Sequence, residues 1–209
     1  MRAGIIHRSV LAIGFFLLMP LLVTAHVVVE ELPSPSAGES AWKYLLLGYE
    51  HILPLGLDHI MFVISLYLLS PKLKPIIVQA TIFTVAHSAT LGLAAYGVIA
   101  PPSRIVEPLI AISIVFVSLQ NIVSPSLRPA RIGIVFLFGL VHGMGFAGAL
   151  GELGLPQEHF LLSLLTFNAG VEFGQLTVIL AMFFAVGFWF GEKPFYRRLI
   201  VVPVSCAII

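Results

Sequence analysis

The stretch EHILPLGLDHIMF, residues 50–62, places two histidines and two carboxylates beside a long apolar segment. Asp58 is the only aspartate in the 209-residue chain, and His59 follows it directly. Neutral imidazole and carboxylate are ligands that suit divalent transition metals such as Zn, Ni, Co or Fe. The stretch therefore predicts a cation site that includes Asp58 and His59.

Further ionisable side chains lie within the apolar segments that follow. Together with the first stretch, the candidate metal ligands are His51, Asp58, His59, His87, Glu107, His142 and Glu172, and the supporting amides are Asn168 and Gln175. The chain has five long apolar segments from residue 51 onward, and none of them contains a lysine or arginine to neutralise the carboxylates. A charge at the bilayer centre costs roughly 2.5–3.5 kcal/mol on insertion scales, so such groups persist where they pair or line a functional site. We predict that these residues line one shared cavity that binds a divalent transition metal ion, Ni, Co or Zn.

The spacing within the first segment leaves the arrangement of its ligands open. His51 and Asp58 are seven residues apart, which separates them by roughly 10 Å along a continuous helix. Pro54 and Gly56, both helix breakers, stand between them. Either the helix begins after Gly56 with His51 folded back over the site, or His51 is an outer docking point. Asp58 either binds the metal or accepts the second N–H of a ligating histidine.

The composition indicates that membrane-spanning helices hold these groups. Hydrophobic residues make up 59% of the chain and charged residues 10%, against about a quarter charged residues in soluble domains. A transmembrane helix needs roughly 20 mainly apolar residues. The predicted spans are residues 51–70, 76–99, 105–123, 132–150 and 161–190. A sixth begins near Leu199 and is too short to cross. The predicted fold is an all-α, polytopic transmembrane helical bundle with five full spans and a truncated sixth.

The start of the chain has the pattern of a secretory signal peptide. Two arginines precede an apolar core, and small residues at the positions expected before a cleavage site end at Ala25. Cleavage there would remove residues 1–25. Residues 26–47 would then form a periplasmic N-terminal segment, and residues 48–209 the transmembrane domain. An uncleaved signal anchor is the alternative.

Five ordered stretches resemble the HupE/UreJ family of bacterial membrane proteins. They are HILPLGLDHIMFV (51–63), FTVAHSATLGL (83–93), VEPLIAISI (106–114), FGLVHGMGFAGAL (138–150) and FNAGVEFGQ (167–175). The interval between the first histidine and the Asp-His pair is one residue longer than in the nickel-permease pattern, which indicates the second branch of the family. The resemblance implies six spans after a cleaved signal peptide and a role as a nickel or cobalt permease. It also implies that the motif residues are His51, Asp58, His59, His87 and His142.

Basic residues occupy every second loop and predict the orientation of the chain. They are Lys72, Lys74, Arg128, Arg131, Lys193, Arg197 and Arg198. Because lysine and arginine gather in cytoplasmic loops, the mature N-terminus is predicted to be periplasmic. The predicted location is the bacterial inner membrane, with the lipid bilayer and a metal ion as partners. No nucleic acid is expected to bind, and a homo-oligomer is left open.

Two other functions fit the same residues. The first is an intramembrane zinc-dependent hydrolase acting on a lipid or a membrane peptide, because three histidines and an acid that leave a position for water form a catalytic zinc site. His59, His87 and His142 with Asp58 would be that set, with one of the two glutamates as general base. The second is a proton-coupled or structural subunit without metal. Transport is preferred, although few polar residues line a route to the cytoplasm: Gln79, Thr81, Thr84, Gln120 and Asn121.

Overall fold

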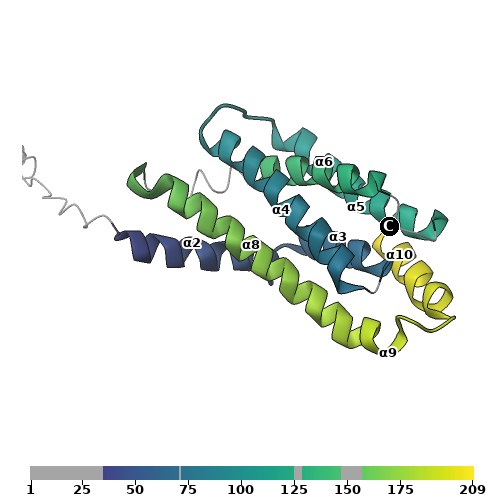
Figure 1. The fold of residues 1–209 in the computed structure, drawn as a ribbon. Coiled ribbons are helices and arrows are strands. Elements are labelled where there is room, and N and C mark those ends of the chain that lie inside the picture. Colours follow the sequence, from purple (N-terminus) through teal and green to yellow (C-terminus); the bar gives the residue numbers. More distant parts are fainter. Residues whose placement is uncertain (1–34, 71, 125–128, 147–156) are drawn as a thin grey trace, which may run out of the picture. The chain divides into compact units, whose positions relative to one another are not determined.

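Figure 1 shows a computed structural model of the chain, which describes residues 35–70, 72–124, 129–146 and 157–209. Every regular element in these ranges is helical, which confirms the all-α prediction. The principal helices are α2 (Ala37–Ile52), α3 (Leu57–Leu68), α4 (Leu73–Ala95), α5 (Ser103–Val123), α6 (Ala130–Gly145) and α8 (Phe160–Met182). A π-helical turn, Phe183–Gly187, leads from α8 into α9 (Phe188–Phe190), and another, Arg197–Val201, leads into α10 (Val202–Ile208). The predicted signal peptide and Arg128 lie outside the described residues.

Length and composition identify the helices that can cross a membrane. Three helices are long and apolar enough to cross by themselves: α4, α5 and the continuous helix Phe160–Phe190. Helices α2 and α3 are long and apolar enough only when they are taken together, as a pair bent by 68°. Helix α6 is a shorter apolar helix. The described part of the chain therefore supports three spans, or four if the bent pair crosses as one. The predicted end of the fourth span, residues 147–150, lies outside the described residues.

The segment predicted as the first span, residues 51–70, is divided between two helices. Helix α2 ends at Ile52 and α3 begins at Leu57. The break falls at Pro54, which has no backbone N–H to donate, and at Gly56, which is the N-cap of α3. The two helix breakers in the sequence therefore mark a sharp bend and not an uninterrupted span.

Helix α2 also extends further toward the N-terminus than the sequence analysis expected. It begins at Ala37, within residues 26–47, for which the sequence predicts an N-terminal segment before the first span. Ser36 Oγ accepts the Glu39 N–H, and the Glu39 carboxylate accepts the Ser36 N–H at 2.8 Å. This reciprocal capping box satisfies two of the backbone donors that a helix leaves unpaired at its start.

Two pairs of helices pack closely: α2 against α8, and α4 against α6. Glycine permits this contact in both pairs. A Cβ on Gly48 of α2 would overlap the Phe167 carbonyl oxygen of α8, and a Cβ on Gly143 of α6 would overlap the His87 carbonyl oxygen of α4. Small residues let transmembrane helices approach closely. The glycines therefore set the separation of the helices that carry the histidines.

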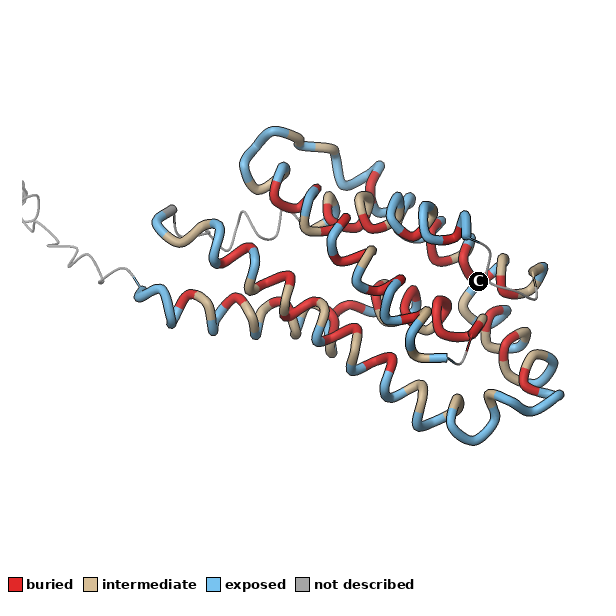
Figure 2. Tube along the Cα trace, in the orientation of Figure 1, coloured by how far each residue is buried: buried red, intermediate tan, exposed pale blue. Residues whose placement is uncertain are grey.

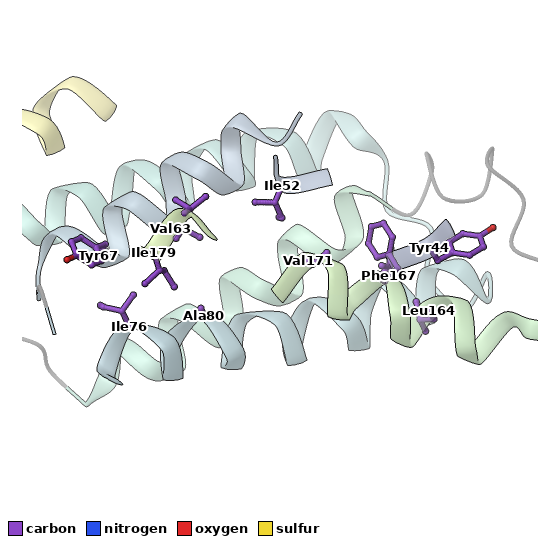
Figure 3. Packing of buried hydrophobic residues seen from close by; sticks show 12 residues of the cluster. Tyr44, Ile52, Val63, Tyr67, Ile76, Ala80, Leu164, Phe167, Val171 and Ile179 are labelled. Atoms are coloured by element: carbon purple, nitrogen blue, oxygen red, sulfur yellow. The ribbon is translucent and has the colours of Figure 1, made fainter. Parts of the chain in front are cut away.

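The inward faces of the helices are buried and the outward faces are largely exposed (Figure 2). Tyr44 of α2 and Phe167 of α8 belong to one apolar core cluster with residues of α3 and α4 (Figure 3). Large apolar side chains such as Val85, Leu137 and Leu165 remain exposed on the outer faces. Histidine, asparagine and arginine side chains, in contrast, are buried inside. An apolar exterior around buried polar groups is the arrangement expected of helices in lipid.

Candidate metal centre

Four histidines from four different helices meet inside the bundle. His51 lies in the last turn of α2, His59 in the first turn of α3, His87 within α4, and His142 in the last turn of α6. The ring centroid of His59 is 4.7 Å from that of His51 and 5.8 Å from that of His87. It is 5.0 Å from the ring centroid of His142. His59 is therefore the central ring of the cluster.

The bend between α2 and α3 carries His51 over the site. A continuous helix would hold His51 and Asp58 about two turns apart. The 68° bend instead brings the His51 ring against that of His59. Gly56 is needed there because a Cβ would overlap the His51 carbonyl oxygen. Of the two arrangements that the spacing allowed, the structure has the one in which the helix begins after Gly56.

The tautomer of His87 is set by Asn168 on α8. Asn168 Nδ2 donates to the Leu164 carbonyl at 2.8 Å, which identifies the other amide atom, Oδ1, as the acceptor. Asn168 Oδ1 lies 3.1 Å from His87 Nδ1. His87 Nδ1 therefore carries the proton, and His87 Nε2 carries a lone pair. Asn168 was predicted only as a supporting polar group, and the structure shows which ring it orients.

The tautomer of His142 is set in the same way by Ser113 on α5. The Ser113 hydroxyl has one proton, which it donates to the Ile110 carbonyl at 2.6 Å. Ser113 Oγ therefore accepts from His142 Nε2, which lies 3.0 Å away. As a result, His142 Nδ1 carries the lone pair. Ser113 is not among the residues predicted from the sequence, where its only signal is a hydroxyl within an apolar segment.

His59 is oriented by its neighbour in the chain. His59 Nδ1 lies 3.2 Å from Asp58 Oδ1, so this ring donates Nδ1–H to a carboxylate and keeps a lone pair on Nε2. Carboxylate–histidine pairs of this kind orient ligating rings in metal sites. Asp58 lies in the first turn of α3, where the positive end of the helix dipole stabilises a carboxylate. This geometry is that of the orienting role predicted for Asp58, in which its carboxylate accepts the second N–H of a ligating histidine.

The remaining nitrogens of these rings are buried acceptors. Within the described residues, no hydrogen-bond partner is found for His59 Nε2, His87 Nε2 or His142 Nδ1, and the same holds for His51 Nε2. A buried acceptor left without a donor costs about 1–3 kcal/mol. Because lone pairs cannot satisfy one another, a shared cation is the species that would satisfy several of them together.

Two groups of ligand atoms are compact enough to hold an ion. One is His51, His59 and His87, and the other is Asp58, His59 and His142, with the atoms of each group within 4.8 Å of one another. A tetrahedral metal with bonds of about 2.0–2.1 Å holds its ligand atoms about 3.4 Å apart. Separations of up to 4.8 Å would have to contract by about 1.4 Å for either group to close around such an ion. His59 belongs to both groups, and the residues present fit a transition metal.

Phenylalanine rings enclose the histidines. The Phe146 ring centroid is 4.0 Å from that of His51, and the Phe83 and Phe62 centroids are 5.0 Å and 5.3 Å from that of His142. A hydrophobic shell of this kind limits solvent access and lowers the dielectric around the ligands. These phenylalanines could not be identified from the sequence, because the chain contains 16 phenylalanines and their spacing does not distinguish them.

The two glutamates predicted as ligands lie outside both groups. Glu172 of α8 accepts hydrogen bonds from the α4 hydroxyls of Thr81, at 2.7 Å, and Thr84, at 2.5 Å. Gln175 Oε1 lies 3.2 Å from Thr84 Oγ1, so this supporting amide belongs with Glu172. Glu107 is exposed on α5. The structure therefore brings together the four histidines and Asp58, and leaves both glutamates apart from them.

A second buried polar cluster surrounds Arg131. The charge pattern of the sequence predicts Arg131 in a basic loop, but α6 begins at Ala130 and the side chain is only 3% exposed. The guanidinium donates to Gln79 Oε1 at 3.1 Å, to Asn121 Oδ1 at 3.2 Å and to the Ser65 carbonyl at 3.4 Å. Two of the polar residues predicted to line a route to the cytoplasm therefore hold an arginine.

The Arg131 cluster lies well away from the histidines along the bundle. Arg131 and His142 are eleven residues apart on α6, a rise of about 16 Å. Gln79 precedes His87 by eight residues on α4, a rise of about 12 Å. The histidine cluster and the Arg131 cluster therefore lie at different levels along the bundle.

The comparisons with known proteins agree with the motifs in the sequence. A family model described as HupE / UreJ protein matches residues 25–209, which include all of the described helices. Searches of curated proteins and of solved structures each found no significant match. The chain is an integral membrane protein that belongs to the HupE/UreJ family, in the second of its branches, as the motifs predicted.

Proposed function

We propose that the protein is a permease that binds a divalent transition metal at the histidine cluster and carries it across the membrane. The observation that supports this most strongly is the set of three buried imidazoles with fixed tautomers, each with one nitrogen free to bind a cation. The HupE/UreJ family is associated with nickel and cobalt uptake. Imidazole nitrogen suits both metals as well as zinc, and we propose nickel or cobalt as the substrate.

The metal would enter at the end of the cluster formed by Asp58 and His51. The Asp58 side chain is 39% exposed, whereas His59 is buried, so an arriving cation meets the carboxylate before the inner rings. Lys72 and Lys74 lie beyond the other end of α3. Because basic residues favour the cytoplasmic side, we place the entrance on the periplasmic face of a bacterial inner membrane.

Glu172 is proposed as a second binding position for the metal on its way across the membrane. Thr84, which donates to Glu172, precedes His87 by one helical turn on α4, a rise of about 4.5 Å. The Glu172 carboxylate is thus the next ionisable group below the histidines on the α4–α8 side. Arg131 occupies the centre of the bundle beyond this level, and its positive charge would repel a cation. The proposed route therefore follows α4 and α8. The prediction that Glu107 is a metal ligand stays a prediction.

Metal content and uptake test the proposal together. Cells expressing the wild-type protein should accumulate nickel or cobalt above cells without it, and the purified protein should bind the same metal. His59→Ala removes the ring common to both ligand groups and should abolish both signals. His159→Ala is the matched control, because His159 lies at the N-cap of α8 and in neither group. Equal accumulation with and without expression would show that the protein does not transport these metals.

The zinc-dependent hydrolase is the second candidate. Two observations favour it: three oriented histidines with Asp58 beside them, and a buried arginine farther along the bundle, whose positive charge would repel a cation. Such a site would retain zinc in a fixed ratio to protein through dialysis, because structural and catalytic zinc binds tightly. Retained zinc, combined with unchanged cellular metal content, would support the hydrolase over the permease.

A further inference from the structure

Arg131 carries a permanent positive charge that the described part of the chain does not neutralise. Its hydrogen-bond partners are the neutral oxygens of Gln79, Asn121 and Ser65. Within the described residues, no carboxylate forms an ion pair with it. Arginine cannot lose its proton in proteins, and an uncompensated buried charge is strongly unfavourable. An anion beside Arg131 would therefore be stabilised.

A cavity of about 340 Å³ lies beside Arg131, between the beginnings of α4 and α6. Lys74 also lines it, so two basic residues border the same space. The rest of the lining is mainly apolar and includes Val78 and Ile132. Both of these side chains are also exposed on the outer faces of their helices. The cavity thus combines basic groups with an apolar surface that continues to the outside of the bundle.

The two helix beginnings at this cavity add further positive potential. Helix α4 begins at Leu73 and α6 at Ala130, and neither start has a side-chain cap or an acidic residue in its first turn. The backbone N–H groups of a first turn have no partner within the helix, and the helix dipole is positive there. Both helices therefore contribute to the same preference for an anion that Arg131 and Lys74 create.

We propose that this cavity binds the phosphate headgroup of an anionic phospholipid, with the acyl chains running outward along Val78 and Ile132. Basic pockets between transmembrane helices are known to bind anionic headgroups. Free phosphate has the same charge chemistry but would leave the apolar lining in contact with water. The site uses no residue of the metal centre, and it stands whether the protein is a permease or a hydrolase.

Thermal unfolding of the full-length protein in vesicles tests this proposal. Three conditions are compared: phosphatidylcholine alone, phosphatidylcholine and phosphatidylglycerol at a ratio of about 3:1, and phosphatidylcholine with inorganic phosphate. A ligand that binds only the folded state raises the unfolding temperature. Phosphatidylglycerol should raise the unfolding temperature of the wild type by about 3 °C, and inorganic phosphate should not. An equal rise with inorganic phosphate would overturn the lipid assignment.

Three variants connect that shift to the cavity. Ile132→Trp fills the space and should abolish the phosphatidylglycerol shift, and Lys74→Gln should reduce it to about half, because each basic residue contributes separately. Lys72→Gln is the matched control, since Lys72 is two residues away and does not line the cavity. A full shift in both Ile132→Trp and Lys74→Gln would overturn the proposal. If Ile132→Trp does not fold, the phosphatidylglycerol shifts of Lys74→Gln and Lys72→Gln are compared. Equal shifts in these two variants would overturn the proposal.

Discussion

His59 and Arg131 are both almost fully buried in the same bundle, with 2% and 3% of their surface exposed, but their surroundings are opposite in kind. The rings of the His59 cluster give their N–H groups to Asp58, Asn168 and Ser113 and keep lone pairs. The Arg131 guanidinium has only hydrogen-bond donors, and neutral oxygens accept its hydrogen bonds. The first cluster has surplus acceptors, which favour a cation, and the second has surplus positive charge, which favours an anion.

The difference follows from the chemistry of the two side chains. Imidazole can be neutral at physiological pH, so the four histidine rings need not carry a charge when the chain folds and can bind an ion afterwards. Guanidinium is always charged, so its surroundings must accept its hydrogen bonds at the moment of folding. The histidine cluster is therefore expected to contribute mainly to binding, and the arginine cluster mainly to stability.

Arg131→Met should give the largest loss of stability. It leaves buried oxygens of Gln79, Asn121 and Ser65 without their donor, and we expect the free energy of unfolding to fall by about 3 kcal/mol. Chemical denaturation in detergent micelles would measure the change. Metal content per folded molecule should be unchanged. A parallel loss of metal would show that the two clusters are not independent.

Gly143→Ala should disturb the histidine cluster through the backbone. The added Cβ would overlap the His87 carbonyl oxygen, so α6 must move away from α4. We expect a loss of about 2 kcal/mol in the free energy of unfolding, together with weaker metal binding, because His87 and His142 separate. Gly133→Ala on the same helix is the control, since a Cβ there meets no atom within 4 Å. Equal effects of both substitutions would contradict the close-contact explanation.

Ser113→Ala should weaken metal binding with little effect on the fold. Without the Ser113 acceptor, His142 can reorient or change tautomer, and loss of a partner of this kind typically lowers metal affinity 10–100-fold. We expect about a tenfold loss, or about 1.4 kcal/mol, by calorimetric titration with nickel. Ser88→Ala provides the comparison, because the Ser88 hydroxyl bonds to the carbonyl of Thr84 on its own helix. Unchanged affinity in Ser113→Ala would argue against His142 as a ligand.

Arg197→Gln should have the smallest effect. Arg197 donates to the carbonyls of Asn121, at 3.0 Å, and Ile122, at 2.7 Å, near the C-terminal end of α5. A cation there satisfies terminal carbonyls and interacts favourably with the helix dipole. Thermal unfolding should show a loss of about 1 kcal/mol. Arg198→Gln, at an exposed neighbouring position, should change stability by less than about 0.5 kcal/mol.

The helical framework could be predicted because lipid imposes a simple rule on the sequence. Long apolar runs must form helices when no water is present to satisfy the backbone. The run predicted at 161–190 is the continuous helix Phe160–Phe190, and that predicted at 105–123 lies within Ser103–Val123. The rule is less informative near helix ends, where hydropathy changes gradually. For this reason the sequence predicts a first span that begins later than α2 and a loop at Arg131.

Part of the candidate site could also be predicted, because buried groups without a counter-charge stand out in an apolar chain. The absence of a counter-charge selected the four histidines and Asp58, which the structure brings together. It selected Glu107 and Glu172 equally, since the sequence does not show which face of a helix a residue occupies relative to another helix. Two threonines of α4 hold Glu172 at a separate position, and no spacing rule within α8 could have shown this.

The sequence by itself determined the ligand types: imidazole and carboxylate, within helices that carry no neutralising base near them. Only the tertiary structure decided which nitrogen of His87 and which nitrogen of His142 is free. His87 depends on Asn168, 81 residues away, and His142 on Ser113, 29 residues away. The physical reason is that an imidazole has a single proton when neutral, and the hydrogen-bond acceptor nearest to it in space determines which nitrogen holds that proton.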